Sequence, residues 1–464
     1  MRRLKKPLQR TPLPRDSRHR SRRAVGSAGK TTVISPSPPS WQDWFPHAGA
    51  VEPPAGLAAL ARAVSSWVES GRPELLLRWL DRDLDGDGVP VRLPVVAWAP
   101  CLAALAEGQS RRPYSWPAAA DARIEGLLRA VLRFCRPDGA PVFGPASPAL
   151  GSEALLRFWA DRLSDPALAA VVDRWFPVRS ADGKSPGVPP LPADARPNRP
   201  LAMLRADWTH RGDFVAIDQR DPLQPCRLEL FGRGQSWLGP DWVSGTAFEP
   251  STPARPTRWL TGPSADVAEW TFQTPTARVT RTVVLLRGRQ LALLADQVHG
   301  PNPSAAMRVA IALGVAPASI PESRMLALCD SRGRSARVLP LLLPGLAYVT
   351  ERGSLSAEGR ELVLRQLNPG KRCWLPLLVS WSPERNRRLT RWRVLTVSDR
   401  SRICRPDVAC ALRVAWGAGE SLVIYRSLAK PTVRAFLGHQ TDARLLIGLF
   451  TKAGEVEPLL KVED

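Results

Sequence analysis

The spacing of apolar residues divides the chain into two parts. Between residues 53 and 176, apolar side chains recur every three or four positions, as Leu57, Leu60 and Val64 do in PPAGLAALARAVSSWVES. This is the period of an amphipathic helix, and proline and glycine separate the periodic segments. The pattern predicts helices within 53–70, 74–80, 95–108, 120–135 and 152–176. We therefore expect a small all-α domain whose helices pack in two layers.

Beyond a Pro-rich segment the chain changes to short apolar strands separated by turns. The predicted strands are 213–218, 227–231, 265–274, 277–288, 290–298, 307–314, 343–353, 359–368, 373–381, 411–417, 420–427, 443–454 and 458–463. So many strands without an intervening helical period predict a large antiparallel sandwich. The expected fold class is multidomain, α plus all-β, with a short α-helical domain before a large antiparallel β-sandwich. The expected boundaries are a tail at 1–40, helices at 50–176, a linker at 177–200 and the sandwich at 201–464.

The net charge of +22 is concentrated at the N-terminus. Residues 1–30 hold eleven Lys and Arg against the single acidic residue Asp16, a balance of +10. Such a segment cannot bury enough apolar surface to fold, so we expect a disordered basic tail over residues 1–40. A basic tail can bind polyanions nonspecifically by counterion release. It carries no interleaved aromatic residues for base stacking, which disfavours specific nucleic-acid recognition.

The cysteines and the N-terminal segment indicate the cellular compartment in which the protein is expected. The seven cysteines form no CxxC pair, which is typical of reduced, buried thiols. No apolar segment follows the basic N-terminus as a signal peptide requires, and no apolar run is long enough to cross a bilayer. We expect a cytoplasmic protein, or a secreted one only if the start is misassigned.

One loop in the helical part has features of a calcium site. In DRDLDGDGVPVR, Asp81, Asp83 and Asp85 occupy positions 1, 3 and 5 and Gly86 occupies position 6. Position 12 is Arg92, where a calcium loop has a bidentate Glu. We therefore favour an Asp/Gly-rich turn and expect no metal or other cofactor.

The segment from Leu204 to Trp242 resembles the first sandwich strands of the heparinase II/III-like polysaccharide lyases. In that family an Arg and a Trp precede an apolar strand, and a second strand leads through a Gly-containing turn to an aspartate. The matching residues here are Leu204, Arg205, Asp207, Trp208, 214–218, Leu228, Glu229, Leu230, Gly234, Leu238 and Asp241. A second block, 277–300, matches through Arg281 and Asp296. The resemblance implies an incomplete α/α toroid for the helices and a cleft for an acidic polysaccharide.

The chain departs from the family where its His-x-Asp loop should lie. Those two residues would fall near Pro222 and Gln224. Proline has no titratable group, and glutamine neither acts as a base nor binds a divalent metal well. The resemblance therefore favours a degenerate relative that binds an acidic glycan without cleaving it efficiently.

Few residues remain for catalysis by β-elimination at a uronate. The reaction needs a base, a group that neutralises the carboxylate, and an acid for the leaving oxygen. His210 is the candidate base because it precedes the first strand, Arg205 is the candidate neutralising group, and Tyr114 is the candidate acid from across the cleft. The alternatives are a surface histidine at 210 and a packed loop aromatic at 114.

Candidate carbohydrate-binding residues are aromatic or cationic. Trp208, Trp237 and Trp242 can form a sugar platform, although packing in the core is the alternative for each. Arg111 and Arg112 can bind a carboxylate or a sulfate through paired hydrogen bonds.

Three functions follow from these features. The first is a degenerate lyase relative that binds an acidic polysaccharide. The second is an active polysaccharide lyase with a rearranged site. The third is a polyanion- or nucleic-acid-associated protein that acts through its basic tail. The missing His-x-Asp pair favours the first.

Overall fold

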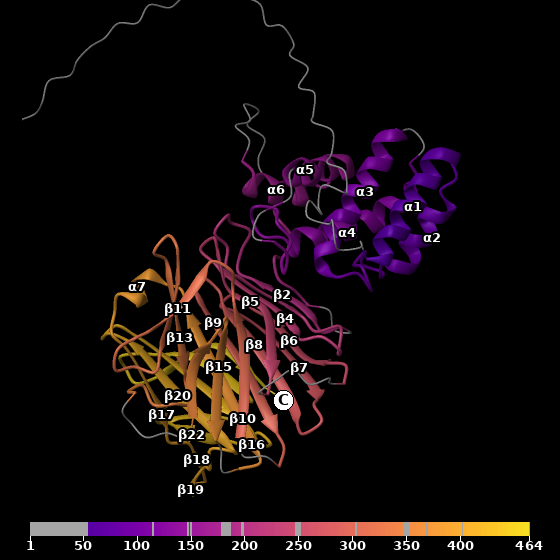
Figure 1. The fold of residues 1–464 in the computed structure, drawn as a ribbon. Coiled ribbons are helices and arrows are strands. Elements are labelled where there is room, and N and C mark those ends of the chain that lie inside the picture. Colours follow the sequence, from indigo (N-terminus) through magenta and orange to yellow (C-terminus); the bar gives the residue numbers. More distant parts are fainter. Residues whose placement is uncertain are drawn as a thin grey trace, which may run out of the picture. The chain divides into compact units, whose positions relative to one another are not determined.

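The structure is a computed structural model that describes residues 54–113, 116–145, 148, 151–177, 187–195, 199–245, 252–301, 304–347, 353–367, 370–400 and 402–463. Helices occupy the first part, and antiparallel sheets occupy the rest (Figure 1). The predicted fold class, a short α-helical domain followed by a large antiparallel β-sandwich, is confirmed. No helix among the described residues combines the length and apolar composition needed to cross a membrane.

The helices bury their apolar faces in one shared core that includes Leu60, Trp98 and Trp159. They are α1 (Ala55–Ser70), α2 (Glu74–Asp83), α3 (Trp98–Arg111), α4 (Asp121–Arg133), α5 (Ser152–Leu163) and α6 (Pro166–Trp175), with 3-10 turns η2 (Val95–Ala97) and η4 (Ala118–Ala120). The helix predicted at 152–176 is two helices. Ser164 adopts a left-handed φ of 55°, and the Asp165 side chain caps the next helix, which begins at a proline.

Two eight-stranded antiparallel sheets form the sandwich. The first sheet contains, in order, β1 (Asp194–Ala195), β2 (Leu201–Arg205), β3 (Phe214–Asp218), β4 (Cys226–Gly232), β5 (Gln235–Ser244), β10 (Ser304–Ile311), β15 (Glu361–Leu367) and β14 (Gly353–Glu358). The second contains β11 (Val315–Ser319), β12 (Leu326–Asp330), β13 (Ser335–Pro340), β16 (Arg372–Ser380), β9 (Leu291–His299), β8 (Arg278–Leu286), β7 (Ala265–Gln273) and β6 (Arg255–Thr261).

Two smaller sheets and a short helix complete the chain. The third sheet contains β17 (Thr390–Leu395), β20 (Ala409–Trp416), β21 (Glu420–Ser427), β24 (Leu445–Phe450) and β25 (Val456–Val462). The fourth contains β19 (Arg402–Ile403), β18 (Ser398–Asp399), β22 (Arg434–Phe436) and β23 (His439–Thr441). Helix α7 (Pro383–Asn386) connects the second sheet to the third.

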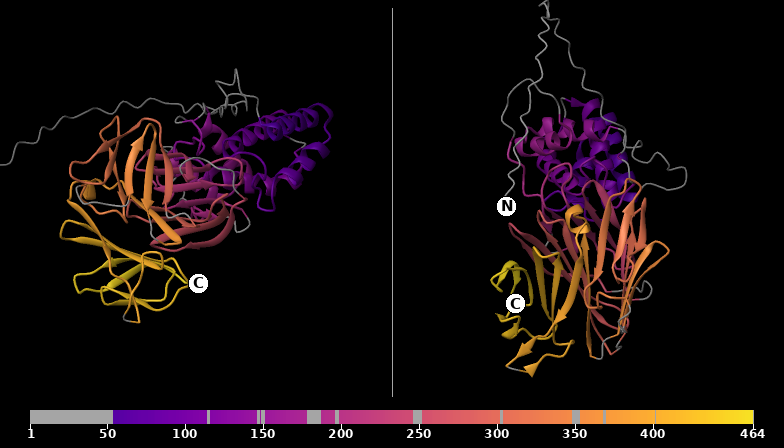
Figure 2. Two further views of the ribbon diagram at one scale, coloured as in Figure 1. Left: turned by 60° about the horizontal axis from the view of Figure 1, so that its bottom comes forward. Right: turned by 90° about the vertical axis from the view of Figure 1, so that its left-hand side faces the viewer.

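Four apolar cores hold the helices and the four sheets together. The core of the helices continues into the first sheet through Met203, Phe214 and Phe231. A second core lies between the two large sheets, a third joins the second sheet to the third, and a fourth lies under the fourth sheet. In Figure 2 the yellow C-terminal strands and the indigo helices accordingly pack against different parts of the sandwich. The first sheet is thus the layer that meets the helices.

A buried ion pair on the second sheet reaches the first sheet through a hydrogen bond to Ser244. Arg281 on β8 and Asp296 on β9 lie opposite each other in register, with Nε–Oδ1 and Nη2–Oδ2 distances of 3.0 and 3.1 Å. Nη2 of Arg281 also donates to the Ser244 hydroxyl on β5 at 2.8 Å. Burial acts to lower the pKa of Arg281, but the charge of Asp296 outweighs it and the pKa lies above its ordinary value. These two residues of the second matching block therefore connect the sheets.

Some strands differ from the sequence-based prediction. The stretch 234–242, which reads as a Gly-rich turn, contains most of the ten-residue strand β5. The predicted strand at 343–353 is a turn in its described part, up to 347, and β14 begins only at Gly353. Gly239 and Pro240 interrupt the alternation of apolar and polar residues along β5, so the strand is not evident from the sequence. The apolar run LLLPGL, residues 341–346, contains Pro344 and Gly345, which favour a turn.

Candidate functional site at the junction of helices and sandwich

A tight turn after α4 brings the helical part to the first sheet. The sequence Arg136-Pro-Asp-Gly-Ala140 closes on itself, because the Arg136 N–H donates to the Ala140 carbonyl at 2.7 Å and the Gly139 N–H donates to the Arg136 carbonyl at 2.9 Å. The turn needs glycine at 139, where φ is +85°. The Asp138 carboxylate accepts the Ala140 N–H at 2.9 Å. The turn directs the side chain of Arg136 at β4.

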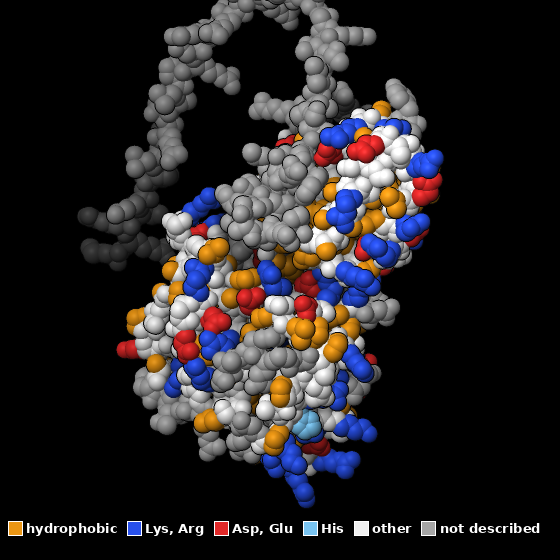
Figure 3. All heavy atoms as spheres, turned by 45° about the vertical axis from the view of Figure 1, so that its right-hand side comes forward, with side chains coloured by type: hydrophobic (Ala, Val, Ile, Leu, Met, Phe, Trp, Pro, Cys, Tyr) orange, Lys and Arg blue, Asp and Glu red, His pale blue; other side chains and the backbone are white. Residues whose placement is uncertain are grey.

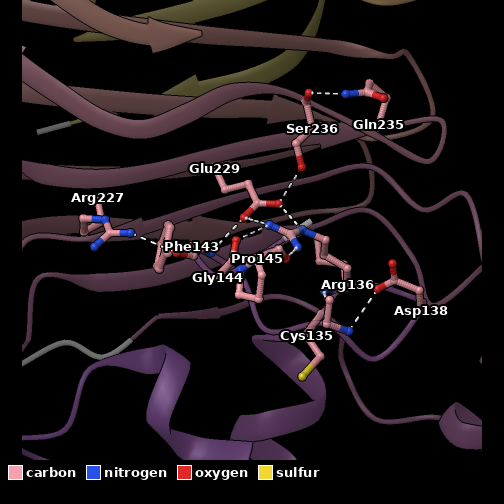
Figure 4. Close-up of polar contacts among 12 residues, drawn as sticks. Cys135, Arg136, Asp138, Phe143, Gly144, Pro145, Arg227, Glu229, Gln235 and Ser236 are labelled. Atoms are coloured by element: carbon pink, nitrogen blue, oxygen red, sulfur yellow. Dashed lines mark hydrogen bonds and ion pairs between the residues drawn. The ribbon is translucent and has the colours of Figure 1, made fainter. Parts of the chain in front are cut away.

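Arg136 forms a buried ion pair with Glu229 of β4 (Figure 4). The guanidinium Nε and Nη2 donate to Oε1 and Oε2 of Glu229 at 2.6 and 2.9 Å. The Phe143 N–H and the Ser236 hydroxyl also donate to this carboxylate, at 2.8 and 2.7 Å. Burial acts to lower the pKa of Arg136, but the charge and hydrogen bonds of Glu229 outweigh it and the pKa is raised. The Glu229 carboxylate thus favours the charged form of Arg136.

A cavity of about 460 Å³ lies beside this pair. Its polar lining includes Arg136, Asp138, His210, Glu229 and Ser236. Its apolar lining includes Phe143, Leu228, Phe231, Leu238 and Leu313. A cavity of this size between two layers, with few polar groups, is typical of a small-ligand or sugar site.

Of the predicted catalytic residues that the structure describes, only His210 lines this cavity. It is exposed in the turn between β2 and β3. The Asp207 carboxylate stabilises that turn by accepting the Thr209 N–H at 2.7 Å. No hydrogen bond orients the His210 ring among the described residues. His210 can therefore contact a ligand, but no neighbour prepares it as a base.

Arg205, predicted as the neutralising group, is fully buried. Its Nη2 donates to the carbonyls of Arg133 and Cys135 at 3.0 and 2.5 Å. Its guanidinium lies 5.2 Å from the ring of Trp208 and 4.6 Å from that of Phe214. Burial lowers the pKa of Arg205 to about 10. Arg205 thus joins the end of α4 to β2 and does not line the cavity.

The predicted tryptophan platform is not at the surface. Trp208, Trp237 and Trp242 are 3%, 1% and 1% exposed. Trp208 donates to the Pro190 carbonyl at 2.6 Å, and Trp237 donates to the Gly232 carbonyl at 3.2 Å. Their rings pack in the cores and offer no face to a sugar in this structure, so we do not include them in the proposed site.

The arginines predicted for glycan binding lie at the end of α3. Arg111 pairs with Glu107 at 2.7 Å. Arg112 donates to the carbonyls of Val68 and Glu69 at 2.5 and 3.3 Å, so it caps the end of α1. Neither residue lines the junction cavity. Tyr114 lies outside the described residues.

The loop where the resemblance places a His-x-Asp pair lies at the other end of the β3–β4 pair from His210. It contains Pro222 and Gln224, and the Gln224 N–H donates to the Asp221 carbonyl at 3.4 Å. Neither residue lines the junction cavity. In the same connection, Arg220 donates to the carbonyls of Pro90 and Leu93 at 3.1 and 3.2 Å. The connection thus anchors the sandwich to the helical part at this end.

The loop with calcium-like spacing closes through its own backbone. Oδ1 of Asp85 accepts the N–H groups of Asp87 and Val89 at 3.0 and 2.8 Å, and its Oδ2 lies 3.4 Å from Arg199. Asp83 pairs with Arg82 at 2.6 Å. Among the described residues no group of three or more His, Cys, Asp and Glu is arranged to bind a metal ion.

Asp213, near the start of β3, has an unusual environment. Nε1 of Trp381 donates to its carboxylate at 2.8 Å. Burial raises the pKa of Asp213 to about 6, and the charge of Asp207 acts in the same direction. Neither Asp213 nor the Arg136–Glu229 pair is predicted by a sequence motif. The sequence does contain one indication of the pair. Glu229 lies within the apolar strand RLELF, and a glutamate that is buried there needs a cationic partner.

No family description matches the chain, and no curated protein sequence matches it. Among solved structures it is similar to the heparan sulfate lyase HepC from Pedobacter heparinus, with a TM-score of 0.55 and 15% identity. It is also similar to a heparinase III with methylated lysines, with a TM-score of 0.58 and 12% identity. The two matches cover 81% and 80% of this chain. The chain spans about 65% of the length of these solved structures, and the likeness shows a heparinase III-like fold.

Proposed function

We propose that this protein is a polysaccharide-lyase relative that binds an acidic glycan at the junction cavity without cleaving it efficiently. The heparinase III-like fold supports the lyase ancestry. The Arg136–Glu229 pair supports the other part of the proposal, namely that the glycan is not cleaved efficiently.

The pair matters because β-elimination needs an unpaired base and a group free to neutralise a carboxylate. Arg136 and Glu229 are the buried charged groups of the cavity wall, and each is saturated by the other and by neighbouring groups. His210 is the remaining candidate base, and no tyrosine is among the cavity-lining residues that the structure describes. Among the described residues the cavity therefore lacks the tyrosine acid, and the arginine in its wall is already neutralised by Glu229.

Binding requires less of the site than catalysis. Asp138, His210 and Ser236 supply hydrogen-bonding groups next to an apolar wall, as sugar recognition requires. The exposed Arg211 and the half-buried Arg233 are the sequence neighbours of the lining residues His210 and Gly234. These two arginines are the proposed contacts for the acidic groups.

The charge of the folded part is dispersed. On the face shown in Figure 3, Lys and Arg side chains are interspersed with Asp and Glu over the helices and the sandwich. Such a surface favours local ion pairs with a glycan over long-range attraction of any polyanion.

Two assays on the full chain test the proposal. With heparan sulfate, chondroitin sulfate and alginate, we expect saturable binding by calorimetry and no absorbance from unsaturated uronate products. Product formation that is lost in His210→Gln would instead establish the active lyase with a rearranged site.

The site itself is tested by substitution. His210→Gln should weaken glycan binding, whereas His439→Gln, the same change in the β22–β23 hairpin, should leave binding unchanged. Deletion of residues 1–40 should also leave binding unchanged. Binding that disappears with the tail would favour the third hypothesis, a polyanion-associated protein acting through residues 1–40.

A further inference from the structure

A second cavity, of about 380 Å³, lies on the third sheet. Its charged and aromatic lining consists of Arg289, Arg413, Glu420, Phe450, Lys452 and Glu457. The turn Gly417-Ala-Gly419 between β20 and β21 forms part of its wall. It shares no lining residue with the junction cavity.

Arg413 on β20 is held in place at this cavity. Its Nε donates to the Ser421 hydroxyl at 2.7 Å, and its guanidinium carbon lies 4.4 Å from the centre of the Phe450 ring. Its Nη1 and Nη2 donate to no acceptor among the described residues. A half-buried guanidinium that is fixed on one edge and open on the other is arranged to bind an oxyanion end-on.

A second arginine lies directly opposite Arg413. Arg393 on β17 is its cross-strand partner in the register, so the two side chains share one face of the sheet. Arg393 is exposed and forms no ion pair or hydrogen bond through its side chain among the described residues. Like charges in opposed positions destabilise a sheet unless an anion lies between them.

The acidic residues of the cavity do not balance its cations. Glu420 is engaged by Arg385 outside the lining, with distances of 3.0 and 2.6 Å to the guanidinium. Glu457 is exposed on the edge strand β25. Because Arg289 also pairs with Glu420, at 3.8 Å, Arg413 and Lys452 supply the positive charge around the cavity that Glu457 alone does not balance.

We propose that this cavity binds a small organic oxyanion, whose carboxylate or phosphate group lies on the open edge of Arg413. Phe450 and Ser421 orient the guanidinium, and Lys452 and Arg393 add positive charge on either side. The site is independent of the glycan site proposed above, because the two cavities lie on different sheets.

Calorimetric titration of the full chain tests this site with succinate, inorganic phosphate and the neutral analogue succinamide. We expect saturable binding of succinate or phosphate and none of succinamide, and the tighter of the two anions identifies the group that is recognised. Arg413→Gln should weaken binding by at least about tenfold, the loss expected for one charge-assisted contact. Arg413→Lys, which keeps the charge but loses the planar fork, should weaken it less.

Two further variants complete the test. Arg332→Gln removes an exposed arginine from the β12–β13 turn of another sheet and should not affect binding. Lys452→Ala changes an exposed side chain and should reduce affinity even if Arg413→Gln fails to fold. The absence of saturable binding by either anion would overturn the proposal, and so would equal affinities in the wild type, Arg413→Gln and Lys452→Ala.

Discussion

Arg136 and Glu229, 93 positions apart in the sequence, form a two-point ion pair between the turn after α4 and strand β4. Both side chains are almost fully buried. A buried pair contributes little compared with an apolar replacement, but removal of one partner leaves an uncompensated charge. The pair therefore makes the contact between the helices and the sandwich specific.

The first prediction concerns this pair. Glu229→Ala should lower the free energy of unfolding by about 3–5 kcal/mol, because Arg136 would stay buried without its counter-charge. Asp241→Ala removes the partner of the more exposed Arg227 and should cost at most about 1 kcal/mol. Denaturant unfolding measures both. Equal losses, or no recovery in the double variant Arg136→Met/Glu229→Met, would contradict the role assigned to the pair.

The second prediction concerns pH. Because the folded-state pKa of Asp213 is raised to about 6, the folded chain binds a proton more tightly than the unfolded chain. The protonated Asp213 carboxyl therefore stabilises the folded chain at about pH 4, by at most about 3 kcal/mol. This stabilisation is lost as the pH rises through about 6. Asp213→Asn keeps an acceptor for Trp381 and should remove this dependence. Identical pH profiles of unfolding free energy for the two proteins would show that the carboxyl does not titrate in this way.

The third prediction concerns a close approach in the first sheet. A Cβ at Gly232 would lie 2.2 Å from Nε1 of Trp381. Gly232→Ala should therefore cost about 1–3 kcal/mol through overpacking. Gly86→Ala, where a Cβ would meet nothing within 4 Å, should stay within about 0.5 kcal/mol of the wild type. Thermal unfolding compares them, and a Gly232→Ala variant as stable as Gly86→Ala would refute the close approach.

The fourth prediction concerns metal. Since Oδ1 of Asp85 accepts two backbone N–H groups of its own turn, chelator treatment should leave the thermal unfolding midpoint unchanged, and added calcium should not raise it. Asp85→Ala should lower stability by about 1 kcal/mol through loss of the turn, with or without calcium. A midpoint that rises with calcium in the wild type but not in Asp85→Ala would show a calcium site.

Much of the fold could be read from local patterns. The three- and four-residue period before residue 176 and the short strands after 201 depend on neighbouring residues, so they predicted the fold class. Local patterns failed where a single residue changes the backbone. Ser164 ends a helix by adopting a left-handed conformation, Pro240 obscured the strand β5, and Pro344 lies in a turn where a strand was predicted.

The candidate site was less accessible to sequence reasoning. Of the predicted functional residues that the structure describes, only His210 lines the junction cavity, whereas Arg205 and the three tryptophans are buried in packing contacts. Sequence spacing cannot distinguish an arginine that meets solvent from one that donates to carbonyls at a helix end. That distinction depends on which surfaces the layers bury.

The sequence by itself determined the period of each segment, and with it the order of helices and strands and the family resemblance, because these properties arise between residues close together in the chain. Only the tertiary structure decided which charged groups neutralise each other. Arg136 meets Glu229 because separate layers pack together, whereas strand pairing within one sheet places Arg281 opposite Asp296 and Arg413 opposite Arg393. Charge pairing across such separations follows from packing and register, and it determines which side chains remain free to bind a ligand.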